Sequence, residues 1–146
     1  MDIRVEEAEF NAGEEVNKFS ARAVKSGAIV SFTGKVRDVS GGLIHMEIEH
    51  YPAMTAKAIT EIANEASTRW SLEDVTVIHR YGQLAPGDDI MMVLTASRHR
   101  SDAFAAAEFL MDYLKSRAPF WKKELTKQGG SWVAARDEDE DALKRW

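Results

Sequence analysis

The sequence contains no cysteine among its 146 residues. This absence excludes disulfides, thiolate metal sites, persulfide carriers and cysteine nucleophiles. Long apolar runs are also missing, because no stretch approaches the roughly 20 residues that cross a bilayer. The first seven residues, MDIRVEE, contain neither the basic segment nor the apolar segment of an export signal. We therefore expect no membrane association and no export signal, and we predict a cytoplasmic location.

An excess of positive charge is the next missing feature. The chain has 24 acidic and 19 basic residues, and residues 137–141 (DEDED) supply five of the acids, which leaves 19 of each sign elsewhere. This balance argues against a general nucleic-acid-binding protein but allows a local basic pocket. The glycine-rich nucleotide-binding patterns and the G-x-S-x-G pattern of hydrolases are absent too, so no motif supports those functions.

The length fits a single domain over residues 1–146, and 45% hydrophobic with 29% charged residues is typical of a globular protein. A strand is predicted over residues 28–33, rich in β-branched and aromatic side chains, and another over 43–51, where polar and apolar residues alternate. Turn residues 38–42 between them predict a hairpin. Pro52 then begins a predicted helix to Trp70.

The same order of elements follows a second time. Strands are predicted over residues 75–81 and 90–97, joined through the turn residues 86–88. A helix capped by Ser101 is predicted from Asp102 to about Arg117. Its predicted buried face is Phe104, Ala107, Met111 and Leu114. Pro119 ends it, and a closing hairpin is expected over 120–126 and 131–135.

The two ends of the chain carry weaker patterns. A short strand is predicted at residues 3–5, and a helix over 14–25 that buries Val16, Phe19 and Ala23. From Asp137 the acidic tail is predicted as a solvated helix or a frayed segment. Hairpins mixed with amphipathic helices predict an α+β fold with a mainly antiparallel sheet and flanking helices.

The sequence Arg98-His99-Arg100-Ser101 lies where a predicted strand ends and a helix begins. Helix N-termini offer free N–H groups and partial positive charge, so these side chains predict an anion-binding site suited to phosphate. The alternative is that they are solvated surface charges.

Three other cations are candidates for the same kind of site. Arg37 follows a predicted strand beside a glycine-rich tip, although it could equally be a solvated edge charge. Lys115 falls in the last helical turn, where the macrodipole alone explains a cation. Lys122 and Lys123 are consecutive in a predicted strand and face opposite sides. Lys123 shares its alternation with Trp121 and Leu125, so the pattern does not select Lys122.

Histidines and tryptophans give weaker signals. His45, His50 and His79 lie on separate predicted strands without metal-ligand spacing, so we expect no metal site and no cofactor. Trp121, Trp132 and Trp146 are expected to anchor the core or an interface.

Several segments resemble the molybdopterin synthase large-subunit family, in order along nearly the whole chain. The longest resemblance is residues 111–124, MDYLKSRAPFWKKE, which keeps several rare residues in fixed order. The others are residues 32–37 (FTGKVR), 49–52 (EHYP), 77–80 (VIHR) and 99–100 (HR).

The resemblance implies an α/β hammerhead fold and an enzyme that works as a heterotetramer. Two large subunits would form a central dimer, with a small ubiquitin-like subunit at each end. The small subunit's Gly-Gly tail would carry a thiocarboxylate, and its sulfur would pass in two rounds to cyclic pyranopterin monophosphate, forming the dithiolene of molybdopterin. A chain without cysteine is compatible with sulfur that arrives on a partner.

The family's functional residues map onto six positions. The resemblance implies that Lys115 and Lys122 are catalytic, and that the substrate phosphate is held by Arg37, His99, Arg100 and Arg136. Arg136 matches an arginine that reaches into the neighbouring subunit's site. Arg98 and Gln83 depart from the family pattern, and Arg98 could alter phosphate affinity.

Two other functions are compatible with the residues alone. The first is a non-catalytic module that binds an anionic ligand or a partner's C-terminal tail. The second is nucleic-acid binding through the basic side chains, which would weaken steeply with salt.

Overall fold

The computed structural model describes residues 1–38, 41–133 and 137–146. A first sheet, sheet A, contains strands in the order β1-β4-β6-β2. The β1–β4 pair is parallel, and the β4–β6 and β6–β2 pairs are antiparallel. Its strands are β1 (Asp2–Glu6), β2 (Ala28–Lys35), β4 (Asp74–Arg80) and β6 (Asp89–Ser97).

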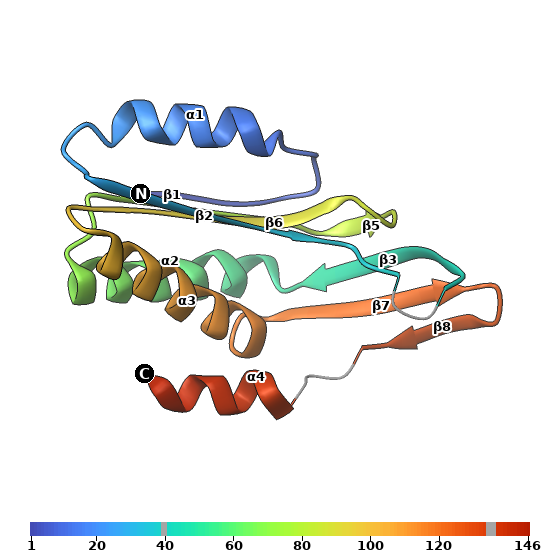
Figure 1. Cartoon of the computed structure of the whole chain (residues 1–146). Coiled ribbons are helices and arrows are strands. Elements are labelled where there is room, and N and C mark those ends of the chain that lie inside the picture. Colours follow the sequence, from blue (N-terminus) through green and yellow to red (C-terminus); the bar gives the residue numbers. More distant parts are fainter. Residues whose placement is uncertain (39–40, 134–136) are drawn as a thin grey trace.

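A second sheet, sheet B, has the order β5-β3-β7-β8, and all of its pairs are antiparallel. Its strands are β3 (Leu43–His50), β5 (Gly82–Leu84), β7 (Phe120–Thr126) and β8 (Gly129–Trp132). In Figure 1, sheet B extends beyond one end of the layer formed by sheet A and its helices.

The helices cover both faces of sheet A (Figure 1). One face carries α1 (Ala12–Arg22), and the other carries α2 (Pro52–Trp70) and α3 (Arg100–Ser116). The chain then ends in α4 (Asp137–Ala142) and the short 3-10 helix η1 (Leu143–Arg145). In Figure 1, α4 lies beside α3, on the side away from sheet A.

The core of the molecule is built around β4 and β6. Both strands are central in sheet A and covered on both faces, so nearly every side chain along them is buried. On the α2/α3 side, Ile59 and Phe109 fill the space and are fully buried, while Ala63 allows α2 to approach closely. On the other side, Phe19 of α1 packs against the sheet.

These findings confirm the predicted α+β fold with mainly antiparallel sheets. The helix over 52–70, the antiparallel pair 75–81 and 90–97, and the strand over 120–126 were all predicted within a residue or two. The short strand near the start is β1, which pairs parallel to β4, and the acidic tail begins with α4. The prediction of one domain over 1–146 stays a prediction.

The predicted hairpin between residues 28–33 and 43–51 is wrong. These strands are β2 and β3, and they belong to different sheets. β2 pairs with β6, while β3 is enclosed by β5 and β7, which come much later in the chain. Pairing on both sides buries Met46 and Ile48 of β3, and this gain outweighs the shorter connection of a local hairpin.

The prediction for α3 was wrong at its start and at Phe104 of the buried face, whereas Ala107 and Leu114 are buried as predicted. The helix begins at Arg100, and its N-cap residue is His99 rather than Ser101. Phe104 is 61% exposed, because the helix turns Ala103, Ala106 and Leu110 toward the sheet instead. The small alanine side chains let α3 lie close to sheet A. Helical periodicity alone does not show whether the buried face starts at Ala103 or at Phe104.

The remaining differences concern element ends. α1 ends at Arg22 rather than Lys25, although Phe19 and Ala23 are buried as predicted. β8 covers 129–132 instead of 131–135, so the glycines counted as turn residues pair with β7. Residues 134 and 135 of that prediction lie outside the described residues.

Candidate functional site

The fold brings Lys115 and Lys122 together. Lys115 occupies the last turn of α3, and Lys122 follows a few residues later in β7. Lys122 lies directly opposite Ile48 of β3, so both side chains lie on the same face of sheet B. Ile48 is 1% exposed, which shows that this face is covered. Burial lowers the pKa of the Lys122 ammonium, and the positive charge of Lys115 lowers it further. We call these two residues the lysine pair.

Lys123 faces the opposite side of β7. Its ammonium lies 5.6 Å from the centroid of the Trp132 ring, and Trp121 on the same side is 42% exposed. The alternation that grouped Lys123 with Trp121 and Leu125 therefore marked the outer face of the hairpin. Aromatic residues on both faces of β7 prevented the pattern from selecting Lys122.

An aromatic column connects the two sheets next to Lys122. The rings of His79 from β4 and Phe120 from β7 stack with centroids 3.7 Å apart and planes at 15°. His50 of β3 follows, 6.0 Å from Phe120 and 4.4 Å from Tyr81. Phe120 is two residues before Lys122 on the same face of β7, so this stack fixes the strand that carries the lysine.

His79 is a buried, neutral histidine. It is 5% exposed, and its Nδ1 lies 2.7 Å from the Arg80 carbonyl oxygen, which accepts a hydrogen bond and so places the proton on Nδ1. Burial lowers its pKa to about 3, with smaller contributions from the charges of Lys122 and His50. From the sequence, His50 and His79 could only be judged to lack metal-ligand spacing, because their strands meet only in the folded chain.

Acid should destabilise the protein through His79. Its pKa is lower in the folded chain than in the unfolded chain, so this stability is present above pH 6.5 and decreases as the pH falls toward 3. Between pH 7 and 5 the loss should be roughly 2 kcal/mol from this group. Denaturant unfolding of the wild type and His79→Gln at both pH values measures it. Equal pH dependence in the two proteins would contradict the prediction.

The predicted phosphate ligands separate into two groups within one chain. Arg37 follows β2, next to Val36, which exchanges backbone hydrogen bonds of 2.9 and 2.8 Å with Asp88 and Gly87. Because α3 runs back along β6, the C-terminal turn of α3, which includes Lys115, lies at this end of sheet A as well (Figure 1). His99 and Arg100 lie at the opposite end of the sheet, where Ala28 pairs with Ser97.

The separation is large. Fifteen residues of α3 from Arg100 to Lys115 correspond to about 22 Å at 1.5 Å per residue. A single chain therefore does not place His99 and Arg100 beside the lysine pair. Arg136, the sixth predicted residue, lies outside the described residues.

The start of α3 keeps the features of an anion site. Arg98, His99 and Arg100 are all exposed. The His99 side chain makes no capping hydrogen bond within the described part of the chain, so the first N–H groups of α3 are not capped by it.

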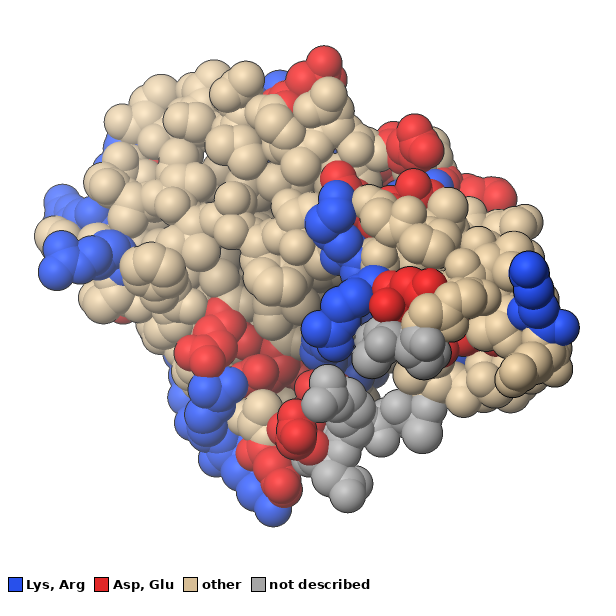
Figure 2. Space-filling view, turned by 45° about the vertical axis from the view of Figure 1, so that its right-hand side comes forward, with Lys and Arg blue, Asp and Glu red and all other residues tan. Residues whose placement is uncertain are grey.

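Figure 2 shows the distribution of charge on one face of the molecule, where basic side chains gather next to acidic ones in the hollow between its two lobes.

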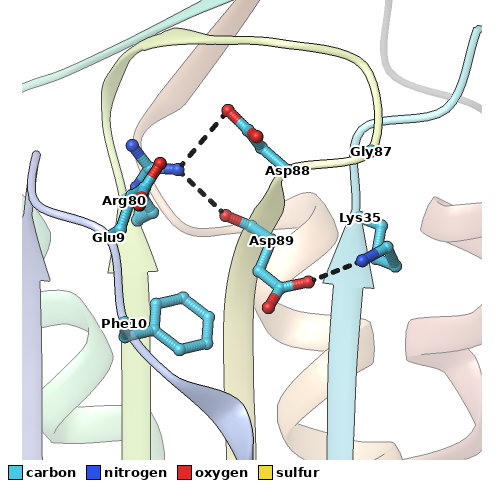
Figure 3. Close-up of a pocket in the computed structure, with 7 residues that line it drawn as sticks. All are labelled: Glu9, Phe10, Lys35, Arg80, Gly87, Asp88 and Asp89. Carbon is cyan, nitrogen blue, oxygen red and sulfur yellow. Dashed lines mark hydrogen bonds and ion pairs between the residues drawn. The ribbon is translucent and has the colours of Figure 1, made fainter.

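Two surface recesses lie elsewhere. One, of about 210 Å³, is lined by residues that include Arg80, Lys35 and Asp89 (Figure 3). Arg80 is 6% exposed and donates to the carbonyl oxygens of Glu7 and Asp89, while Lys35 pairs with the Asp89 carboxylate at 3.0 Å. These contacts tie the segment after β1 to β4 and β6, and they explain the recess as structural.

The other recess, of about 410 Å³, is aromatic. Its lining includes Tyr51, Trp121 and Trp132 with His50 and Glu49, and the Tyr51 and Trp121 rings meet edge to face at 4.7 Å. Neither Lys115 nor Lys122 is among the described residues that line the two recesses.

Within residues 1–38, 41–133 and 137–146, no group of three or more His, Asp or Glu side chains is arranged to hold a metal ion. In the same part of the chain, no helix has the length and apolar character that a membrane span requires.

Comparison with known proteins decides the family. A family model described as "MoaE protein" matches residues 5–117. The chain belongs to the MoaE family. A relative from Cereibacter sphaeroides, named molybdopterin synthase catalytic subunit, is 60% identical over 146 residues and is covered completely by this chain, as this chain is by it. A Yersinia pestis relative with the same name is 53% identical, over 99% of this chain and 96% of its own.

Solved structures agree with this assignment. The MoaE protein of Burkholderia ambifaria superposes with a TM-score of 0.85 at 51% identity, covering 99% of this chain and 97% of its own. A complex of subunits 1 and 2 of the Helicobacter pylori molybdopterin-converting factor contains a chain with a TM-score of 0.80 at 18% identity, covering 92% and 91%, which shows the MoaE fold alone. The resemblance to the molybdopterin synthase large subunit is confirmed, and the chain is an enzyme of molybdenum cofactor biosynthesis.

Proposed function

We propose that the chain transfers sulfur from the C-terminal thiocarboxylate of a small ubiquitin-like subunit to cyclic pyranopterin monophosphate. The product would be the dithiolene of molybdopterin. The lysine pair carries this proposal, because it places a second cation next to a desolvated ammonium. The membership of the chain in the MoaE family supports it as well. Sulfur arrives on the partner's Gly-Gly tail, and the reaction needs no resident cofactor.

The two lysines have different roles in this proposal. Lys115 engages the partner's terminal carbonyl or the pterin as acid, base or transient nucleophile. Lys122 stabilises the negative charge that develops when sulfur leaves the thiocarboxylate. A cation already desolvated by the protein interacts more strongly with such charge than a hydrated one. A lowered pKa also lets Lys122 release its proton at less cost than an exposed lysine.

The phosphate of the substrate is held by Arg37, His99, Arg100 and Arg136 in this proposal. Since His99 and Arg100 lie about 22 Å from the lysine pair in one chain, a complete site uses these two residues from a second copy. Two copies of the chain then form the centre of a heterotetramer, with a small subunit at each end.

The edge of sheet A supports such pairing. β2 is one of the two edge strands of sheet A among the described residues, and β1 is the other. Phe32 on β2 is 41% exposed, and Phe104 of α3 is 61% exposed. A two-fold axis near the middle of β2 would place Ala28 of one copy opposite Lys35 of the other. His99 and Arg100 follow the strand that pairs with Ala28, so this arrangement moves them toward the partner's Arg37.

One assay tests the proposed function. The chain is mixed with a thiocarboxylated small subunit and cyclic pyranopterin monophosphate, and the dithiolene product is measured. Product should form only when all three are present. Tight binding of the partner tail or the pterin without product, under conditions in which a relative's synthase works, would instead establish the non-catalytic binding module. The cytoplasm remains the predicted location of the reaction.

A further inference from the structure

Three large aromatic side chains lie together at the end of sheet B where β3 ends and β7 begins. Tyr51, Trp121 and Trp132 are all exposed, and all three line the second recess, which we call the aromatic recess. Trp121 and Trp132 project from the face of β7 and β8 that is opposite to the face of Lys122. Exposed rings gathered in one place are typical of a surface that a partner protein covers.

The walls of the aromatic recess are fixed by contacts within the chain. The Tyr51 and Trp121 rings meet edge to face at 4.7 Å, and Pro52 follows Tyr51 as the first residue of α2. Lys123 lies directly opposite Trp132, with its ammonium 5.6 Å from the centroid of that ring. A recess that is formed in advance costs little ordering entropy when a ligand enters it. The contact of Lys123 also shows that a ring on this face accepts a cation.

Glu49 gives the aromatic recess a negative charge. It lies directly opposite Trp121 in the β3–β7 pair, so the carboxylate and the ring project from the same face of sheet B. Its side chain is exposed and lines the recess. Within the described parts of the chain this carboxylate has no hydrogen-bond or ion-pair partner, whereas that of Glu47 lies 3.4 Å from Nε2 of His45. An unpaired carboxylate beside aromatic rings is complementary to an organic cation.

We propose that the aromatic recess is the anchor point for the small ubiquitin-like subunit, and that it receives an arginine side chain of this partner. A guanidinium that stacks on Trp121 or Trp132 can form two parallel hydrogen bonds to the Glu49 carboxylate. Tryptophan, tyrosine and arginine are also the residues that most often carry the binding energy of protein interfaces. The inference rests on the proposed function, which supplies the partner.

The position of the aromatic recess favours the small subunit over a second copy of the chain. Trp121 directly precedes Lys122 in β7, so a protein seated on the recess lies across sheet B from the lysine pair. An extended tail advances about 3.3 Å per residue, so a few residues carry it round the end of the sheet. His50 lines the recess and also meets the Phe120 ring at 6.0 Å on the lysine side, which marks this route.

Binding of the small subunit tests the inference without any sulfur transfer. The full-length chain is titrated with the small subunit, whose tail carries the ordinary carboxylate, in a calorimeter. Glu49→Gln keeps the shape of the side chain and removes its charge, so the dissociation constant should rise roughly 10- to 100-fold. Glu47→Gln is the matched control, because it removes the same charge from the same face of β3. Its dissociation constant should stay within a few-fold of the wild-type value.

The arginine is located from the side of the partner. Each arginine of the small subunit is replaced by glutamine in turn, and each variant is titrated against the wild type and against Glu49→Gln. One replacement should weaken binding to the wild type as much as Glu49→Gln does, and should weaken binding to Glu49→Gln much less, because the two side chains form one contact.

Three results would overturn the inference. They are an unchanged dissociation constant in Glu49→Gln, an equal rise in Glu47→Gln, and the absence of any arginine whose effect depends on Glu49. A wild type that binds the small subunit through Glu49 but forms no dithiolene would support the docking site and reject sulfur transfer. A wild type that does not bind the small subunit would reject both.

Discussion

Replacing Lys122 by alanine is expected to lower kcat by about 10²- to 10³-fold, the usual effect of losing one group that stabilises charge in a transition state. The side chain faces the interior of sheet B beside Lys115, and its loss leaves the aromatic stack of His79 and Phe120 in place. Single-turnover kinetics with saturating thiocarboxylated partner measure the effect.

Lys123→Ala is the matched control for this substitution. It removes the same charge one residue along β7, but from the outer face, where the ammonium lies over Trp132. Its kcat should stay within a few-fold of the wild type, and both variants should keep the wild-type melting temperature. Equal losses in the two variants, or full activity in Lys122→Ala, would show that the lysine assignment is wrong.

A mixture of two inactive variants is expected to recover activity. If each site takes Lys122 from one copy and Arg100 from the other, a dimer of one Lys122→Ala chain and one Arg100→Ala chain contains one intact site. Half of the sites in such a mixed dimer should be intact, which corresponds to about a quarter of all sites when equal amounts pair at random. The two variants are co-expressed with different affinity tags, and the dithiolene assay is applied to the doubly selected dimer.

The control mixture combines Lys122→Ala with Lys115→Ala. Both lysines come from the same copy, so no pairing of these chains assembles an intact site, and activity should stay at the level of the separate variants. Recovery in the control, or none with Arg100→Ala, would mean that the site is not divided between copies as proposed.

The sequence predicted most of the fold because its elements have strong local patterns. Pro52 marks the start of α2, and the apolar strands 75–81 and 90–97 flank a turn whose Gly87 has a φ of +88°. The pairing of β2 and β3 could not be predicted in this way. Their connection resembles a hairpin, but β3 pairs instead with β5 and β7, which are distant in the sequence.

The candidate site was predictable in part. Composition and position favoured an anion site at the start of α3. The family resemblance grouped this site with Lys115, although the length of the helix separates the two within one chain. Lys122 came from the family resemblance, because alternation along β7 pointed to Lys123. His79 was missed since its relation to Lys122 depends on strands that are distant in sequence.

The central claim is that sulfur passes from the partner's tail to the pterin at the lysine pair. A sulfur balance tests it most directly, by mass spectrometry of the small subunit and of the pterin in the same quenched reaction. Wild-type chain should convert two thiocarboxylates to carboxylates for each dithiolene formed, and Lys122→Ala should leave both molecules unchanged over the same time. Loss of thiocarboxylate without sulfur on the pterin, or the same balance in Lys122→Ala, would contradict the account.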